Sequence, residues 1–117
     1  MIVIKRINDP PNPNDGLRVL VDQVWPRGLR KERVRIDEWR KDLAPSNALR
    51  KWFGHVPTRW EEFKRRYPQE LETRGKVDEL RKLADEAKRE KITLLFGAGD
   101  EEHNNAVILK ELLESLS

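Results

Sequence analysis

Two groups of polar and charged side chains in this sequence each follow an apolar run. The first follows Leu17–Val21 and contains Asp22, Trp25, Arg27 and Gly28. A guanidinium group can hold a phosphate or a carboxylate through two parallel hydrogen bonds, and an indole ring beside it can stack on a flat ligand. We therefore expect Arg27 and Trp25 to bind an anionic ligand in a loop shaped by Gly28. Asp22 is a candidate general base, with pairing to Arg27 as the alternative.

The second group follows the run Ile92–Phe96 and contains Asp100, His103 and Asn104. Histidine titrates near neutrality and can act as an acid or a base, and Asp100 could orient it. Asn104 opens a segment with helical periodicity, where it is a ligand-binding or helix-capping candidate. A helix N-terminus offers free N–H groups to an anion. The glycines of Phe96–Asp100 match neither the dinucleotide-binding fingerprint nor the P-loop, so they predict a plain turn.

His55 is a third candidate for acid–base chemistry. It follows Gly54 in a loop between two aromatic segments, where it either caps a carbonyl or faces a cleft. The chain has two histidines and no cysteine, so we expect no metal site and no cofactor. The catalytic candidates are therefore His103, His55 and Asp22, and the sequence leaves open whether the site only binds or also catalyses.

The elements that must position these residues are strands and helices in alternation. Apolar runs predict strands at residues 2–7, 17–21 and 92–96. A long helical stretch separates the last two, which favours a crossover and parallel pairing. We expect a small single α/β domain over residues 1–117, Rossmann-like in outline, with about three strands, at least two of them parallel, layered with helices. Ligands bind beyond the carboxyl ends of such strands, so both groups of candidate residues should meet at one edge.

Helices are expected between and after these strands. Asp37 is a plausible N-cap for a short helix carrying Trp39 and Leu43. A second helix should end at Gly54. Thr58 and Glu61 resemble a capping box for a third helix, which Pro68 should break or restart. Further helices are expected from Lys76 and from about Asn104 to Leu116.

Charge is distributed unevenly along the chain. Residues 1–67 carry 16 basic and 9 acidic side chains, a net charge of +7, whereas residues 68–117 carry 8 basic and 12 acidic ones, a net charge of −4. Five basic residues are concentrated in one stretch: Arg27, Arg30, Lys31, Arg33 and Arg35. Solvated surface or phosphate-backbone binding would account for that stretch. The modest overall charge of +3 and the lack of a helix-turn-helix or RNA-binding signature make nucleic acid a weakly supported partner.

The composition also bounds the location of the protein. No stretch approaches the 18 or so apolar residues that a membrane-spanning helix needs, and the N-terminus lacks the pattern of a signal peptide. We expect a cytoplasmic protein with no membrane partner; the oligomeric state is not predicted. Abundant Glu, Lys and Arg with two Gln are typical of thermophile surfaces.

Four segments of the chain resemble the YeaO-like family, a domain of unknown function (number 488). They read RVLVDQVWPRG, LAPSNALRKWFGH, WEEFKRRY and TLLFGAGDEEHNNAVIL, in that order, and together they span most of the sequence. The resemblance implies a small α/β domain and brings no established activity. More distant relatives carry a Cys–His pair after the last strand, where this chain has His103-Asn104-Asn105, so thiol chemistry is not expected. The motif positions are Asp22, Trp25, Pro26, Arg27, Gly28, Ser46, Trp52, Phe53, His55, Tyr67, Asp100, His103 and Asn104.

Three functional hypotheses follow. The first is a site for an anionic small molecule, such as a nucleotide or a phosphorylated metabolite, between the two strand-end loops. The second is nucleic-acid binding through the basic stretch, with Trp25 as a stacking platform. The third is a protein-interaction module without catalysis, which should expose an apolar patch and form a stable oligomer.

Overall fold

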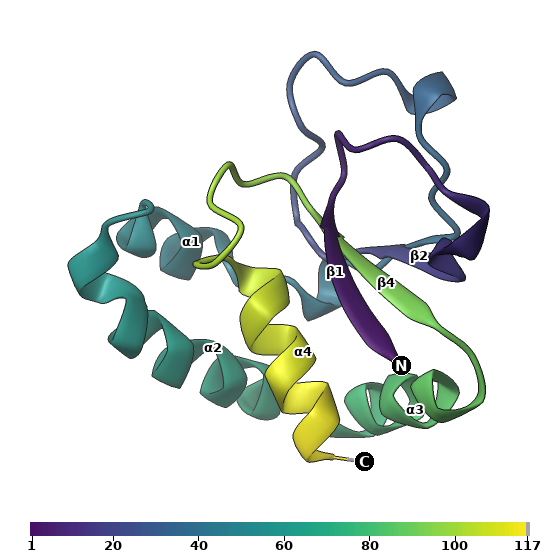
Figure 1. The fold of residues 1–117 in the computed structure, drawn as a ribbon. Helices are drawn as coiled ribbons and strands as arrows, with labels where there is room; N and C mark the ends of the chain where they lie inside the picture. Colours follow the sequence, from purple (N-terminus) through teal and green to yellow (C-terminus); the bar gives the residue numbers. More distant parts are fainter. Residues whose placement is uncertain (117) are drawn as a thin grey trace.

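The computed structural model describes residues 1–116, and its centre is a four-stranded parallel sheet. The strands are β1 (Ile2–Arg6), β2 (Leu17–Leu20), β3 (Glu38–Trp39) and β4 (Ile92–Phe96). Their order across the sheet is β1-β4-β2-β3, so β4 lies in the middle with β1 and β2 on either side (Figure 1). All three pairings are parallel. The expected α/β class and the parallel pairing of the strands at 17–21 and 92–96 are thus confirmed.

Four α-helices lie on one face of this sheet. They are α1 (Asn47–Phe53), α2 (Trp60–Thr73), α3 (Val77–Arg89) and α4 (Asn105–Ser115). Helix α4 packs against β1 and β4 and also contacts α2 and α3, while α1 packs against α2 (Figure 1). Short 3-10 turns occupy Pro13–Asp15, Lys31–Arg33, Lys41–Leu43 and Pro57–Arg59.

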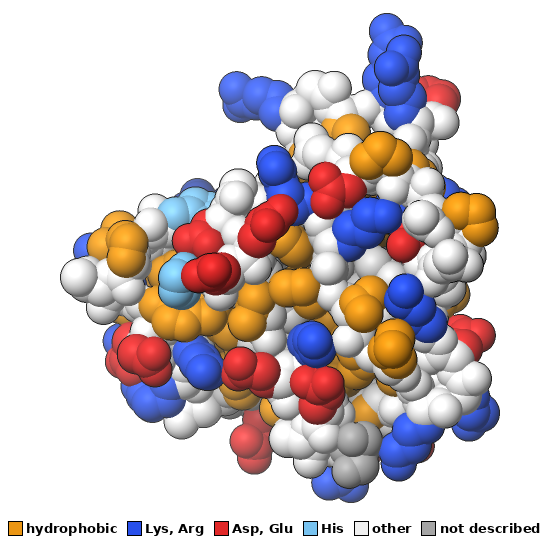
Figure 2. Space-filling view, in the orientation of Figure 1, with side chains coloured by type: hydrophobic (Ala, Val, Ile, Leu, Met, Phe, Trp, Pro, Cys, Tyr) orange, Lys and Arg blue, Asp and Glu red, His pale blue; other side chains and the backbone are white. Residues whose placement is uncertain are grey.

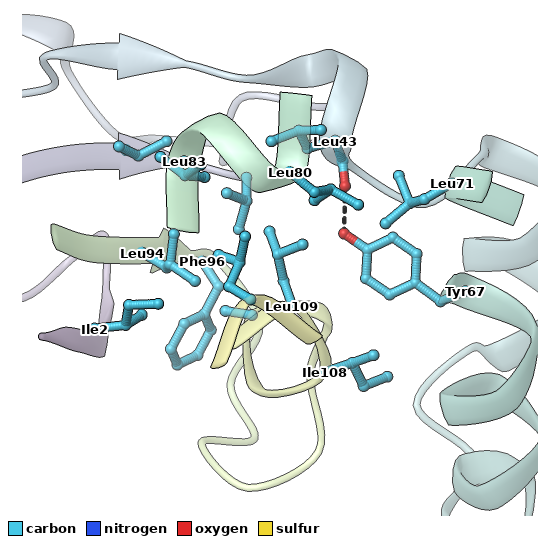
Figure 3. Packing of buried hydrophobic residues seen from close by; sticks show 14 of the residues in the cluster. Ile2, Leu43, Tyr67, Leu71, Leu80, Leu83, Leu94, Phe96, Ile108 and Leu109 are labelled. Carbon is cyan, nitrogen blue, oxygen red and sulfur yellow. Dashed lines mark hydrogen bonds between the residues drawn. The ribbon is translucent and has the colours of Figure 1, made fainter. Parts of the chain in front are cut away.

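The larger hydrophobic core fills the space between the sheet and the helices. Because side chains alternate along a strand, Leu94 and Phe96 of β4 point to the helical face, where they meet Leu80, Leu83 and Leu109 (Figure 3). Tyr67 of α2 is fully buried there, and its hydroxyl donates a hydrogen bond to the Leu43 carbonyl (Figure 3). That bond satisfies the phenol inside the apolar core, and burial raises the pKa of the Tyr67 hydroxyl.

The opposite face of the sheet is covered by loops instead of helices. A smaller cluster of Ile7, Leu20 and Leu95 lies under Trp25, Trp39 and the apolar residues of the connection between β2 and β3. Beside it, the side chain of Arg18 is fully buried and donates to the Asp15 carboxylate at 2.5 Å and to the Arg35 carbonyl at 2.5 Å. Lys5 and the Asn12 amide also donate to Asp15. This ionic cluster ties two surface loops to the sheet.

Three local predictions from the sequence were wrong. Glu38 and Trp39, expected in a helix capped by Asp37, form the fourth strand β3, whose edge position needs only two residues of pairing with β2. Thr58 does not cap a helix, because Pro57–Arg59 form a 3-10 turn that leads directly into α2. Helix α2 also continues through Pro68. Its interior side chains are buried, and this tertiary packing outweighs the loss of one helical hydrogen bond.

No helix among residues 1–116 is long and apolar enough to cross a membrane.

Candidate functional site

A pocket of about 340 Å³ opens at the carboxyl ends of β2 and β4. Its size is at the lower end of the range for small-molecule sites, which is about 300–1,000 Å³. The pocket is lined by Asp22, Gln23, Val24, Trp25, Pro26, Arg27, Pro45, Arg50, Phe53, His55, Phe63, Gly97, Ala98, Asn104 and Asn105. Five of the eight candidate site residues therefore share one cavity: Asp22, Trp25, Arg27, His55 and Asn104.

The carboxylate of Asp22 joins the two strand-end loops. Its Oδ2 accepts a hydrogen bond of 2.7 Å from the Gly97 amide, and its Oδ1 accepts one of 3.1 Å from the side-chain amide of Asn105. The same Asn105 group also donates to the Val21 carbonyl at 2.8 Å. The approach at Gly97 is close, since a Cβ atom there would lie 3.1 Å from Asp22 Oδ2 and 3.2 Å from Pro26 Cγ. Residue 97 must therefore be small for the carboxylate to sit in this position.

The environment of Asp22 favours its neutral form more than water does. Burial raises the pKa of the Asp22 carboxyl above its ordinary value. The hydrogen bonds from Gly97 and Asn105, and the electrostatic influence of Arg50 and His55, act in the opposite direction. Asp22 is thus a partly desolvated acceptor at the inner end of the pocket, with cationic side chains nearby.

Arg27 lies exposed on the loop after β2, in a turn that returns the chain toward the sheet. The Leu29 amide donates to the Pro26 carbonyl at 3.4 Å, and Gly28 has a φ of +81°, the left-handed conformation that such a turn needs at its third position. Trp25 is fixed by a 2.7 Å hydrogen bond from its indole N–H to the Leu29 carbonyl. Within residues 1–116, Arg27 makes no hydrogen bond or ion pair through its side chain, so the alternative of a bridge to Asp22 is not realised.

His55 reaches the same pocket from the end of α1. Gly54 and His55 both have left-handed backbone conformations, with φ values of 50° and 58°. His55 is the one non-glycine residue with positive φ in the described chain. Such a conformation costs an L-amino acid roughly 1–2 kcal/mol. Its ring packs 5.8 Å from that of Phe53 and projects into solvent at the pocket edge.

The three candidates from the segment after β4 occupy two different places. Asn104 is buried and caps α4, since its side chain accepts from the Val107 amide at 3.1 Å. Asp100 and His103 form a pair outside the pocket lining, with 3.0 Å between Asp100 Oδ2 and His103 Nδ1. The other edge of the His103 ring meets Trp60, with centroids 5.1 Å apart. Gly28, like Asp100 and His103, lies outside the lining.

Sequence reasoning missed several residues that line the pocket. Arg50 lies one helical turn before Phe53 on α1, and that spacing within LRKWF was a usable signal that both face one side. Phe53 and Phe63 stack with centroids 4.3 Å apart, and apolar residues at helical spacing indicate a core position before a site. Asn105 follows the capping Asn104 as the first residue of α4, and no sequence pattern marks its contact with Asp22. No sequence pattern identifies Gln23, whose Oε1 is buried without a hydrogen-bond partner.

The fold and the pocket together define a class: a small parallel α/β domain with one helical face and, at its strand ends, a cavity lined by both polar and apolar residues. No group of three or more acidic or histidine side chains within residues 1–116 is placed to hold a metal ion.

The chain belongs to the DUF488 family, because a family model described as the inactive DUF488-N3 subclade matches residues 1–116. The chain is 40% identical over 115 residues to the uncharacterized protein YeaO of Escherichia coli K12, covering 98% of each chain. It is also 40% identical over 110 residues to the uncharacterized protein Rv3073c of Mycobacterium tuberculosis H37Rv, covering 94% of this chain and 91% of the relative. No solved structure matches significantly. The family resemblance drawn from the motifs is confirmed.

Proposed function

We propose that this protein binds an anionic small molecule, of the nucleotide or phosphorylated-metabolite type, in the pocket at the ends of β2 and β4. The observation that carries the proposal is the charge of the lining: Arg27, Arg50 and His55 stand against the single carboxylate of Asp22. Cationic donors in a partly apolar pocket bind phosphate or carboxylate groups through charge-assisted hydrogen bonds. Arg27 has no partner inside the described chain that would compete for such a ligand.

The proposed activity is binding, without an assigned reaction. The matching family model carries the description "inactive" for its subclade. The lining supplies carboxylate, imidazole, guanidinium and amide groups, which are sufficient to hold and orient a ligand. Asp22 and His55, the acid–base candidates that share the pocket, serve here as an acceptor and a donor for the ligand.

Binding can be tested by a thermal-shift screen followed by calorimetry with inorganic phosphate, ribose 5-phosphate and nucleoside monophosphates. A ligand at about 100 times its Kd stabilises the folded state by roughly 2.7 kcal/mol. The Arg27→Ala variant should keep its unfolding midpoint and weaken binding by about tenfold or more, since hydrogen bonds to charged groups contribute about 1.5–3 kcal/mol. Arg30→Ala is the matched control, because Arg30 is exposed on the same loop and outside the pocket.

The outcomes distinguish binding in the pocket from general electrostatic attraction to the basic loop. Loss in Arg27→Ala with retention in Arg30→Ala supports the pocket. Equal weakening in both variants would contradict it and would point to diffuse electrostatics. The absence of a response to every anion of the panel would remove the proposal.

Nucleic-acid binding is the second candidate, favoured by one observation. The basic residues of the stretch Arg27–Arg35 are all exposed on the connection between β2 and β3. Figure 2 shows lysine and arginine side chains projecting from the end of the molecule where this connection lies. If a nucleic-acid backbone binds there, the affinity for a short oligonucleotide should fall steeply as the salt concentration rises. The slope of log affinity against log salt concentration then reflects the number of phosphates contacted. Affinity that does not change with salt would rule this candidate out.

A further inference from the structure

The inner and outer ends of the pocket present different chemical groups to a ligand. The inner group is the Asp22 carboxylate, partly desolvated and held by Gly97 and Asn105. The guanidinium groups of Arg27 and Arg50 and the imidazole of His55 are all exposed at the outer part of the same pocket. A single anionic group on a ligand can satisfy only the outer part, because a second anion placed inside would face a carboxylate.

The hydrogen bonds already made at the inner end of the pocket indicate which ligand groups can bind there. The side-chain amides of Asn104 and Asn105 already donate to the Asp100 carbonyl, the Val21 carbonyl and Asp22. The Asp22 oxygens each accept one bond from the protein and have capacity for further donors. The group with spare capacity at the inner end is thus the Asp22 carboxylate, an acceptor, so a complementary ligand must present donors there.

The walls around these acceptors are apolar and largely aromatic. Pro26 and the Asp22 carboxylate both lie against Gly97, since a Cβ built there would be 3.2 Å from Pro26 Cγ and 3.1 Å from Asp22 Oδ2. The stacked rings of Phe53 and Phe63 also line the cavity. Flat rings pack favourably against such surfaces. An aromatic ring bearing an amino group meets both requirements, whereas a sugar hydroxyl meets only the hydrogen-bonding one.

We infer that the ligand is a flat, amino-bearing ring with an anionic group at its opposite end, the chemistry of an amino-bearing nucleoside monophosphate. The amino group donates to Asp22, and the phosphate faces Arg27, Arg50 and His55. This assignment rests on the proposed function, which requires only the anion. It adds the orientation of the ligand and the identity of its inner group.

Matched ligand pairs test the inference on the unmodified protein. Each pair differs by one amino group: adenosine and purine-riboside 5′-monophosphates, guanosine and inosine 5′-monophosphates, and cytidine and pyrimidin-2-one-riboside 5′-monophosphates. Calorimetry should show that at least one amino-bearing member binds about tenfold or more tightly than its partner, the loss expected for one hydrogen bond to a charged group. Ribose 5-phosphate measures the contribution of the anion alone.

The Asp22→Asn variant tests whether the preference for the amino-bearing ligand depends on Asp22. In Asp22→Asn the preference for the amino-bearing member should fall to about twofold or less, whereas Asp78→Asn should keep it. Asp78 is an exposed carboxylate in the first turn of α3, outside the pocket. Should Asp22→Asn fail to fold, the ligand pairs still decide the question on the unmodified chain.

Failure of the inference and failure of the proposed function give different results. Equal affinity within all three pairs, with binding still lost in Arg27→Ala, overturns the amino-group assignment and leaves the anion site intact. No binding of any nucleotide, ribose 5-phosphate or phosphate overturns both. A preference that survives in Asp22→Asn contradicts the assignment of the amino group to Asp22.

Discussion

Substitutions of His55 test whether the pocket binds a ligand, because the backbone conformation of this residue lowers the free energy of unfolding. At a φ of 58° an L side chain costs roughly 1–2 kcal/mol relative to the ordinary helical region. Replacing His55 by glycine removes that strain but adds about 0.4–1 kcal/mol of unfolded-chain entropy. It also removes the contact with the Phe53 ring at 5.8 Å, which at an exposed position contributes about 0.5 kcal/mol. The free energy of unfolding should therefore stay within about 1 kcal/mol of its original value.

Alanine at the same position gives the diagnostic comparison. His55→Ala loses the ring contact and keeps the strained conformation, so it should be less stable than His55→Gly by about 1 kcal/mol. At a position with negative φ the order is reversed, because glycine then only adds unfolded-state entropy. Equilibrium urea unfolding followed by tryptophan fluorescence measures the difference. A more stable alanine variant would refute the strain argument.

Binding is measured on the same variants. Both His55→Gly and His55→Ala should weaken the binding of adenosine 5′-monophosphate by about two- to tenfold, the effect of one ordinary hydrogen bond. His103→Ala is the matched control, since the second histidine of the chain lies outside the pocket lining against Asp100 and Trp60. It should bind the nucleotide as the unmodified protein does. Unchanged affinity in His55→Gly would show that the strained residue does not serve the ligand.

Three further predictions concern the fold around the site. Burial opposes ionisation of Asp15, but hydrogen bonds from its neighbours, including Arg18, hold its pKa at about 2; its contribution to stability is thus present above about pH 4 and lost as the pH falls toward 2. Acid titration of the unfolding free energy should show this loss in the unmodified protein and not in Asp15→Asn. Gly97→Ala should displace the Asp22 carboxylate and weaken nucleotide binding by more than about threefold in calorimetry, through the loss of a hydrogen-bonded position. Ser46→Ala removes the cap of α1 and should lower the unfolding free energy by about 1 kcal/mol in urea.

Periodic apolar runs predicted the parts of the fold that depend on local pattern. The runs at 17–21 and 92–96 are buried apart from the partly exposed Leu17, and their hydrophobicity predicted the strands, while the long helical stretch between them predicted the parallel pairing. Strand β3 escaped detection because two residues carry no periodicity. Helix α2 passes through Pro68 because Phe63, Tyr67 and Leu71 bury its interior face, and that packing is a tertiary effect.

The candidate site was predictable where it depended on sheet topology. Asp22, Trp25, Arg27 and Asn104 meet in one pocket because β2 and β4 are parallel neighbours whose carboxyl ends share an edge. Arg50 lies on α1 and Phe63 on α2. Their positions in the pocket lining depend on how these helices pack, which the sequence pattern does not show. The turn in the segment Gly97–Asn104 carries His103 away from the cavity to Trp60, and only side-chain geometry could show this. The buried Arg18–Asp15 pair was equally hidden, because a charged residue inside a strand usually indicates an exposed position.

The matching subclade is described as inactive, and the structure gives a separate argument about binding. Here a carboxylate is partly desolvated at Asp22, an acceptor is buried and unpaired at Gln23, and His55 holds a strained backbone, all within one pocket. Each of these features costs free energy in the empty protein, and a ligand that donates a hydrogen bond to Asp22 would offset the cost of desolvating that carboxylate. Their concentration in a single cavity favours a binding protein over a remnant scaffold. The stability of His55→Gly together with its nucleotide affinity decides between the two.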